Sequence, residues 1–193
     1  MAVIPYGAPI ANVASGQMGP PIFSARCYSS NTIADADFVQ IDGSHAGYID
    51  TCAADVASGI IGIAQHGSSA VYDQIATGIQ GVFGSSQENT NLFPGTPGEI
   101  LVVTLGANII VAINLPATTG WVSGGTHQAN LGTEVGLNID GTTGFFYADD
   151  QEANKVAYIS QKIIGPGQGG VGDLGARVYI SFIPSVLSPV TGH

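Results

Sequence analysis

Apolar and polar residues alternate along most of the chain from residue 22 onward, which is the two-residue period of β-strands. The clearest example is the segment 177–183, where Val178, Ile180 and Phe182 fall on one face. Further strand-like segments are separated by turn-forming residues, and they cover 38–41, 48–52, 60–64, 99–104, 108–115, 134–138, 144–147 and 155–161. Short strands with turns at roughly 8- to 12-residue spacing are typical of a β-sandwich or a β-barrel.

Two Asp-Gly dipeptides mark the sharpest predicted turns. Asp42-Gly43 and Asp140-Gly141 each lie between two strand-like segments, a pattern that indicates β-hairpins. Only residues 71–79 have a helical spacing of apolar residues, and Gly78 and Gly81 would end a helix there. No internal repeat with a fixed period is apparent. The pattern therefore predicts an all-β fold, either a single β-barrel or a jelly-roll-like sandwich.

The first 21 residues depart from this pattern. Four of them are prolines, which fix φ and remove backbone donors, so we expect an extended N-terminal arm outside any regular sheet. The arm carries large apolar residues that a solvated linker would not need, namely Val3, Ile4, Tyr6, Ile10, Val13 and Met18. We expect these six to contact another subunit, the alternative being a strap along the arm's own domain. The predicted organisation is an arm at 1–21, a barrel or sandwich domain at 22–187 and a C-terminal tail at 188–193.

The small number of basic residues limits the classes of binding partner that we expect. The chain has 193 residues with 14 acidic and four basic side chains, and the basic residues do not cluster. Nucleic acids and anionic membranes are recognised by clustered Lys and Arg, so neither is an expected partner. The N-terminus has no signal-peptide pattern, and no apolar run approaches the roughly 18 residues of a membrane span. We therefore expect a soluble protein made in a cytoplasm.

Only 9% of the residues are charged while 45% are hydrophobic. Globular proteins have about 25% charged residues, so the surface of this protein must be made largely of neutral groups. Soluble monomers avoid large exposed apolar patches, and a surface so poor in charge favours burial against partners. We therefore expect a homo-oligomer, with a trimer favoured.

No combination of residues indicates catalysis. Residues 165–170 match the pattern G-x-G-x-x-G, but no helix follows them as dinucleotide binding requires. The histidines are His45, His66, His127 and His193, and none accompanies a G-x-S-x-G nucleophile motif. We expect the protein not to be an enzyme. A cupin-like metalloenzyme, the remaining catalytic alternative, would need two or three of these histidines to converge.

The candidate metal and redox residues point to structural roles. Cys27 and Cys52 have no His partner at zinc spacing, so we expect two buried thiols, with a cross-strand disulfide as the alternative. The acidic clusters 35–37 and 149–152 lack the pattern of a calcium loop, so we expect solvated turn acids, with a structural calcium ion as the alternative. Trp121 is expected to fill the core or an intersubunit contact instead of stacking on a sugar. We therefore predict no cofactor and no metal.

Several of these segments resemble the capsid decoration (cement) proteins of tailed bacteriophages. In the C-terminal third a Leu-Gly-Thr turn precedes an aromatic strand, and a Gly-x-Arg-Val strand follows; these segments are 130–137, 144–149, 154–160 and 175–184. Upstream, the hairpin 38–53 and the strand 60–64 resemble the opening of the same proteins. The resemblance covers roughly residues 36–184 and departs from the family at Val135, where an aromatic residue is common, in the longer 84–98 loop and in the arm.

The resemblance implies a structural virion protein that binds the outer surface of an assembled phage capsid and stabilises it. It implies two partners, the major capsid protein and further copies of the chain itself. The protein would be made in the host cytoplasm and reside on the outer capsid surface, with the arm contacting the capsid or a neighbouring subunit. The alternative function is a carbohydrate- or receptor-binding module of a phage tail or fibre, which would need an exposed aromatic platform.

Overall fold

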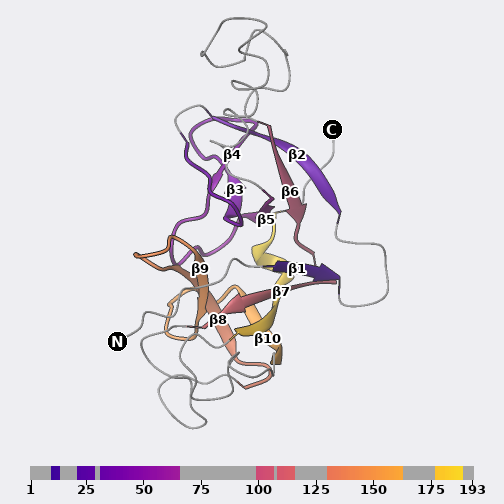
Figure 1. Ribbon diagram of the computed structural model, residues 1–193, viewed down its shortest axis with the longest axis vertical. Helices are drawn as coiled ribbons and strands as arrows, with labels where there is room; N and C mark the ends of the chain where they lie inside the picture. The colour runs from indigo at the N-terminus through magenta and orange to yellow at the C-terminus, as the bar shows by residue number, and fades with distance from the viewer. Residues whose placement is uncertain are drawn as a thin grey trace, which may run out of the picture.

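The protein is all-β in a computed structural model that describes residues 10–13, 21–28, 31–65, 99–106, 108–115, 130–162 and 177–188 (Figure 1). This confirms the predicted fold class. The strands are β1 (Ile10–Val13), β2 (Ile22–Cys27), β3 (Phe38–Ile41), β4 (Tyr48–Thr51), β5 (Ile60–Ala64), β6 (Glu99–Thr104), β7 (Ile109–Asn114), β8 (Glu134–Ile139), β9 (Phe146–Asp149), β10 (Ala157–Lys162) and β11 (Arg177–Phe182), followed by the 3-10 turn η2 (Pro184–Val186). No helix within these ranges is long and apolar enough to cross a membrane.

The strands form two closed rings of five strands each. Barrel 1 has the order β2-β4-β3-β5-β6, and barrel 2 has the order β7-β11-β10-β8-β9 and closes through a parallel pair between Asn114 and Tyr147. Barrel 1 forms the upper part of the view in Figure 1 and barrel 2 the lower part. The sequence predicted a barrel, and the structure adds that the chain builds two of them in place of a single one.

The two barrels have the same topology. In each, the first strand pairs parallel with the third and antiparallel with the fifth, while the second pairs with the third and the fourth. The hairpin between the second and third strands contains Ile41-Asp42-Gly43-Ser44 in barrel 1 and Ile139-Asp140-Gly141-Thr142 in barrel 2. The chain thus contains a structural repeat that its sequence does not reveal, because a turn and an alternating pattern are all that the halves share.

Two hydrophobic cores hold the barrels together. The smaller core fills barrel 1 and includes Val39, Ile61 and Ile100. The larger core fills barrel 2 and extends onto the outer face of barrel 1, where it takes in Phe38 and Ile60. All five residues of β5 are buried, because one face of this strand lines barrel 1 and the other packs against barrel 2. This double burial explains why β5 is an unbroken apolar run in the sequence.

Aromatic rings form the centre of the joint between the barrels. The ring of Phe38 in β3 lies edge-on to Phe146 in β9 at a centroid distance of 5.2 Å, and it is tilted against Phe182 in β11 at 5.6 Å. All three side chains are buried. Such edge-to-face pairs contribute about 0.5–1.5 kcal/mol beyond the burial of their area. The joint is therefore packed like a domain interior.

Backbone hydrogen bonds reinforce this joint. Asp55 adopts a left-handed conformation with φ 56°, and its N–H donates to the carbonyl oxygen of Leu137 at 2.8 Å. Its carboxylate accepts the backbone N–H of Asn154 at 2.9 Å. Past η2, the N–H of Ser188 donates to the carbonyl oxygen of Ile60 at 2.9 Å. The C-terminal end of barrel 2 is thereby tied back to barrel 1.

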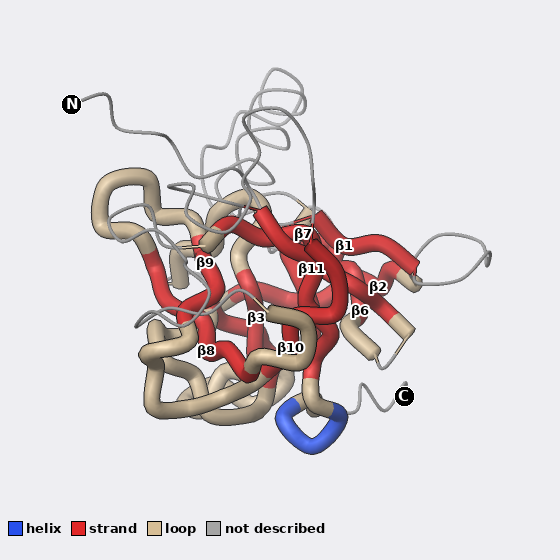
Figure 2. Tube along the Cα trace, turned by 90° about the horizontal axis from the view of Figure 1, so that it is seen from below, coloured by secondary structure: helices blue, strands red, loops and turns tan. Residues whose placement is uncertain are grey.

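The N-terminal strand differs from the sequence prediction. Ile10–Val13 form β1, which pairs antiparallel with β7 from Ile10 opposite Ala112 to Val13 opposite Ile109. Figure 2 shows β1 alongside β7. The prediction that the arm lies outside any regular sheet is wrong for these four residues. The prolines of the arm flank the strand without interrupting it, so its backbone donors remain available. The predicted helix at 71–79 lies outside the described residues.

Candidate functional site

The residues singled out from the sequence are only partly described by the structure. Of the six apolar arm residues, Ile10 and Val13 belong to β1, while Val3, Ile4, Tyr6 and Met18 lie outside the described residues. Of the histidines, His45 is described, whereas His66, His127 and His193 are not. The most extensive polar network that the structure describes surrounds this one histidine.

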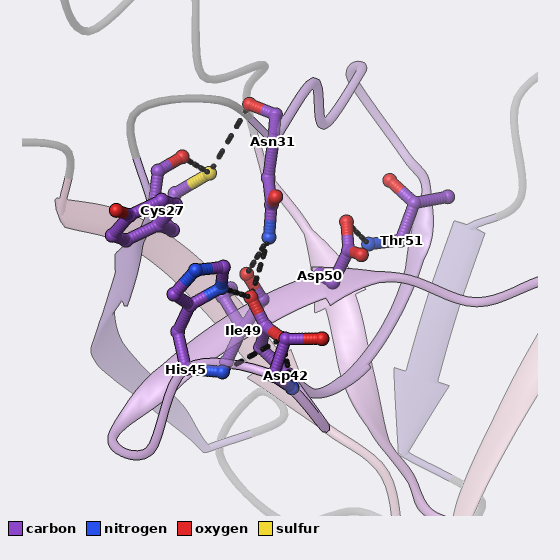
Figure 3. Close-up of polar contacts among 9 residues, drawn as sticks. Cys27, Asn31, Asp42, His45, Ile49, Asp50 and Thr51 are labelled. Carbon is purple, nitrogen blue, oxygen red and sulfur yellow. Dashed lines mark hydrogen bonds and ion pairs between the residues drawn. The ribbon is translucent and has the colours of Figure 1, made fainter.

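The network is centred on the carboxylate of Asp42, at the turn between β3 and β4 (Figure 3). One carboxylate oxygen accepts the backbone N–H groups of Ser44 at 2.7 Å and His45 at 3.1 Å. The other accepts the side-chain amide of Asn31 at 2.8 Å and lies 2.8 Å from Nδ1 of His45. We call Asn31, Asp42 and His45, together with the rings of Tyr28 and Tyr48, the Asp42 cluster.

Two tyrosines complete the cluster. The ring of Tyr28 stacks on the imidazole of His45 with a centroid distance of 3.5 Å and an interplanar angle of 12°. Tyr48 meets Tyr28 edge-on at 5.4 Å. The side chain of His45 is 34% exposed and that of Asp42 only 6%. The hairpin tip is therefore fastened to the segment after β2 by one carboxylate and one stacked ring.

The donors around Asp42 keep its carboxyl group ionised. The backbone N–H of Ser44 and then the side chain of His45 hold the pKa of Asp42 well below its usual range. An Asp–His pair also occurs in hydrolase triads, where the second imidazole nitrogen activates a nucleophile. In the part of the chain that the structure describes, no hydroxyl or thiol is hydrogen-bonded to Nε2 of His45. Among the described residues, the geometry orients the imidazole ring and caps the turn.

The equivalent turn of barrel 2 is simpler. A carboxylate oxygen of Asp140 accepts the backbone N–H of Thr143 at 2.8 Å and its hydroxyl at 2.6 Å. Thr143 stands where barrel 1 has the histidine. The aspartate that caps the turn is thus common to both barrels, whereas among the described residues the contacts of Asn31, His45 and Tyr28 occur only in barrel 1.

The acidic cluster at 35–37 has a structural role. Asp37 is only 5% exposed, so the expectation of a solvated turn acid is wrong for this residue. One of its oxygens accepts the backbone N–H of Ala34 at 2.7 Å and the hydroxyl of Thr51 at 3.0 Å. Burial raises its pKa, and these two hydrogen bonds act in the opposite direction. Local donors explain how a carboxylate is accommodated inside the protein.

The acidic loop at 149–152 is organised by a lysine. The ammonium group of Lys155 donates to the carbonyl oxygens of Asp150, at 2.5 Å, and of Glu152. Asp149 is buried, again in contrast to the expected solvated acid, and it accepts the backbone N–H of Gln151 at 2.9 Å. Burial raises the pKa of Glu152. Lys155 thus places a positive charge within this acidic loop, and the described ranges contain no set of three or more His, Cys, Asp or Glu residues that could hold a metal ion.

Both cysteines are buried thiols, as expected, and the disulfide alternative is not realised. Cys27 packs in the smaller core and Cys52 in the larger one. Burial raises the pKa of Cys52, and the nearby carboxylates of Asp37 and Asp50 raise it further. A thiol that is protonated and buried is a poor nucleophile.

The sequence predicted the Asp42-Gly43 turn but not the network around it. The Asp-Gly turn and the closeness of Asp42 to His45 are visible along the chain, but Tyr28 and Asn31 come from a different segment and carry no local signal. Comparison of the chain with protein-family models, with curated proteins and with solved structures finds no match.

Proposed function

We propose that this protein is a structural component of a virus particle that binds the outer surface of an assembled bacteriophage capsid. The proposal rests on where the segments that resemble capsid decoration proteins lie in the structure. The segments 38–53, 60–64, 144–149 and 175–184 supply strands or hairpins to both barrels and to the joint between them. The resemblance therefore coincides with the structural body of the protein and not with one detachable motif.

The use of the polar residues supports the same proposal. The buried carboxylates of Asp37, Asp42 and Asp149 each accept backbone N–H groups of their own turns. These carboxylates hold their turns in place through local hydrogen bonds to the backbone. Turns that are held rigidly in this way suit a protein that presents a fixed binding surface to its partners.

Exposed apolar side chains supply candidate contacts on both barrels. Ile22 on β2 and Leu101 on β6 are 54% and 45% exposed, and the register places them two positions apart on neighbouring strands. Leu131 and Tyr158 are exposed on barrel 2. Exposed apolar side chains of this kind suit binding to capsid protein and to further copies of the chain.

Stabilisation of the capsid by the bound protein follows from mass action. A ligand that binds only the assembled lattice stabilises it by RT ln(1 + [L]/Kd) at each site, or about 2.7 kcal/mol at a hundredfold excess over Kd. This gain is repeated at every occupied site of the shell.

The proposal is tested by adding the purified protein to phage particles that lack it. We expect saturable occupancy, seen as ordered density on the outer surface by electron cryomicroscopy, and release of packaged DNA at a higher temperature. Emptied capsids that have been dissociated into subunits should bind far less, because the lattice is then lost. Failure to bind intact particles, together with specific binding on a glycan array, would favour the alternative, a carbohydrate- or receptor-binding module.

A further inference from the structure

The pairing of β1 crosses the order of the two barrels. This strand precedes barrel 1 in the sequence, yet it pairs with β7 of barrel 2, with Asn12 opposite Ile110. Its neighbour along the chain, β2, belongs to barrel 1. The N-terminal strand is therefore not part of either five-stranded ring, and it is added to a ring from outside.

The edge of β7 explains why a strand can be added there. On one side β7 pairs with β11 along most of its length, from Ile110 to Asn114. On the other side β9 pairs only at Asn114, near the end of β7. Of the other positions of β7 on this side, β1 covers 109–112. Barrel 2 thus has a site for one short antiparallel strand, defined by backbone groups and by register.

We propose that β1 is exchanged between copies of this chain, so that the N-terminal strand of one subunit pairs with β7 of its neighbour. The inference rests on the proposed function, in which the protein is a homo-oligomer on a capsid. It identifies the occupant of the β7 edge as a second copy of this chain and makes the arm the link between subunits.

Identical contacts are the first reason for a second copy. A neighbouring β1 makes the same hydrogen bonds in the same register, so exchange changes few contact energies and is a low-cost route to oligomers. Fixed neighbours on a shell also raise the effective concentration of the exchanging strand into the millimolar range, as a rough guide from tethered systems.

The connection to β2 sets the geometry of exchange. Seven residues separate Val13 from Pro21, and a fully extended chain between these two residues spans at most about 29 Å. The neighbour must therefore present its β7 edge close to the β2 end of the donor. This distance favours a compact ring of subunits in which each gives and receives one strand.

A double-cysteine variant tests the exchange in the full-length protein. Directly opposed residues of antiparallel strands have Cα atoms about 4.5–5.5 Å apart, which is within the range of disulfides. We therefore expect Asn12→Cys combined with Ile110→Cys to form a disulfide under mild oxidation. Exchange predicts covalent oligomers on a non-reducing denaturing gel, whereas pairing within one chain gives a cross-linked monomer.

Mixed assemblies give an independent readout. A tagged chain with Asn12→Cys is coexpressed with an untagged chain carrying Ile110→Cys, and exchange predicts that a tagged–untagged covalent dimer forms. The matched control replaces Ile110→Cys by Ala53→Cys, an exposed position in barrel 1 that is not paired with β1, and should give at least tenfold less dimer. The wild-type chain, with two buried thiols, serves as the baseline.

The outcomes separate the two proposals. A cross-linked monomer, or no disulfide in the double variant, overturns the exchange of β1, even where the protein still occupies particles. Loss of particle binding in the unmodified protein overturns the proposed function, whatever the gels show. Tagged–untagged dimers formed on particles and in free oligomers support exchange.

Discussion

At the scale of single residues, the turns of this protein depend on carboxylates that face backbone N–H groups. Asp42 is the strongest example, because four donor groups from three residues surround it. A second residue-level constraint is close backbone approach. A Cβ added to Gly62 would lie 2.4 Å from the carbonyl oxygen of Val103 and 2.3 Å from Cγ1 of Val102. Both features lead to direct tests.

Replacing Asp42 by asparagine should destabilise the protein in a pH-dependent way. The pKa of Asp42 is lower in the folded protein than in the unfolded chain, so its stabilisation is fully present above the unfolded value of roughly 3.9. This contribution is lost as the pH falls from there through the folded pKa. We therefore expect wild type and Asp42→Asn to differ in urea midpoint at pH 7 and to converge progressively below about pH 4.

The matched control is Asp140→Asn in the equivalent turn of barrel 2. Asp140 accepts hydrogen bonds from Thr143, and the described residues supply it with no contacts that match those of Asn31 and His45. We expect a smaller change in urea midpoint at pH 7 for Asp140→Asn, because fewer hydrogen bonds are lost. An Asp42→Asn variant with the wild-type pH profile would contradict the assigned role of the carboxylate.

Replacing Gly62 by alanine should be severely destabilising. The added methyl group would clash with the backbone of β6, and overpacking of a rigid site costs typically about 1–3 kcal/mol or more. Gly43→Ala is the control, because its Cβ would meet nothing within 4 Å. Chemical denaturation of the two variants should show a clear loss of stability for the first and a change within about 0.5 kcal/mol for the second.

At the scale of elements, β3 and β5 each contribute residues to both hydrophobic cores. Each lines barrel 1 with some of its residues and packs on barrel 2 with others, so the same strands build one core and the joint to the other. Phe38 is the residue through which β3 meets β9 and β11. The barrels are therefore expected to unfold together and not one after the other.

Truncating Phe38 to alanine tests this coupling. Removing a fully buried phenylalanine costs about 3–5 kcal/mol, and the loss should appear in both barrels. Native-state hydrogen exchange of β2 and β8 amides is the measurement. We expect the protection of both strands to fall by a similar free energy. Leu131→Ala, at a side chain that is 67% exposed, should leave both unchanged. A fall confined to barrel 2 would show that the barrels are independent units.

At the scale of the whole molecule, two small barrels of one topology are joined by the larger of the two apolar cores, and a strand from the N-terminal arm pairs with the second barrel. Small barrels have little interior of their own, and fusion lets the outer face of one serve as a wall for the other. The arm is the element that this body does not require for closing either ring.

Deleting residues 2–21 should leave the two-barrel body folded. Each ring keeps all five of its strands, so we expect only a small fall in melting temperature, caused by the loss of the β1 pairing. Capsid occupancy should fall sharply, because the arm is proposed to link subunits. The measurement combines thermal unfolding of the truncated protein with its occupancy on particles that lack the protein. Unfolding of the body would identify the arm as an intramolecular strap, and unchanged occupancy would contradict its role in binding.

The sequence by itself determined the class of structure and the places where it turns. Strict alternation, as in Val178, Ile180 and Phe182, commits a segment to a strand with one buried face, and the burial of β11 alternates in this way. The two Asp-Gly turns also lie where the sequence places them, because turn formation depends on adjacent residues. These features are local, so a single chain segment contains the information.

Only the tertiary structure decided how many barrels there are, which strands close them and what surrounds Asp42. Closure depends on pairs distant in sequence, such as Asn114 with Tyr147 and Arg26 with Tyr48, and alternation does not specify which strands become neighbours. Asn31 and Tyr28 reach the Asp42 turn because barrel 1 closes beside it. Likewise, the prolines around β1 suggested an arm outside the sheet, whereas the exposed edge of β7 gave its residues 10–13 a partner.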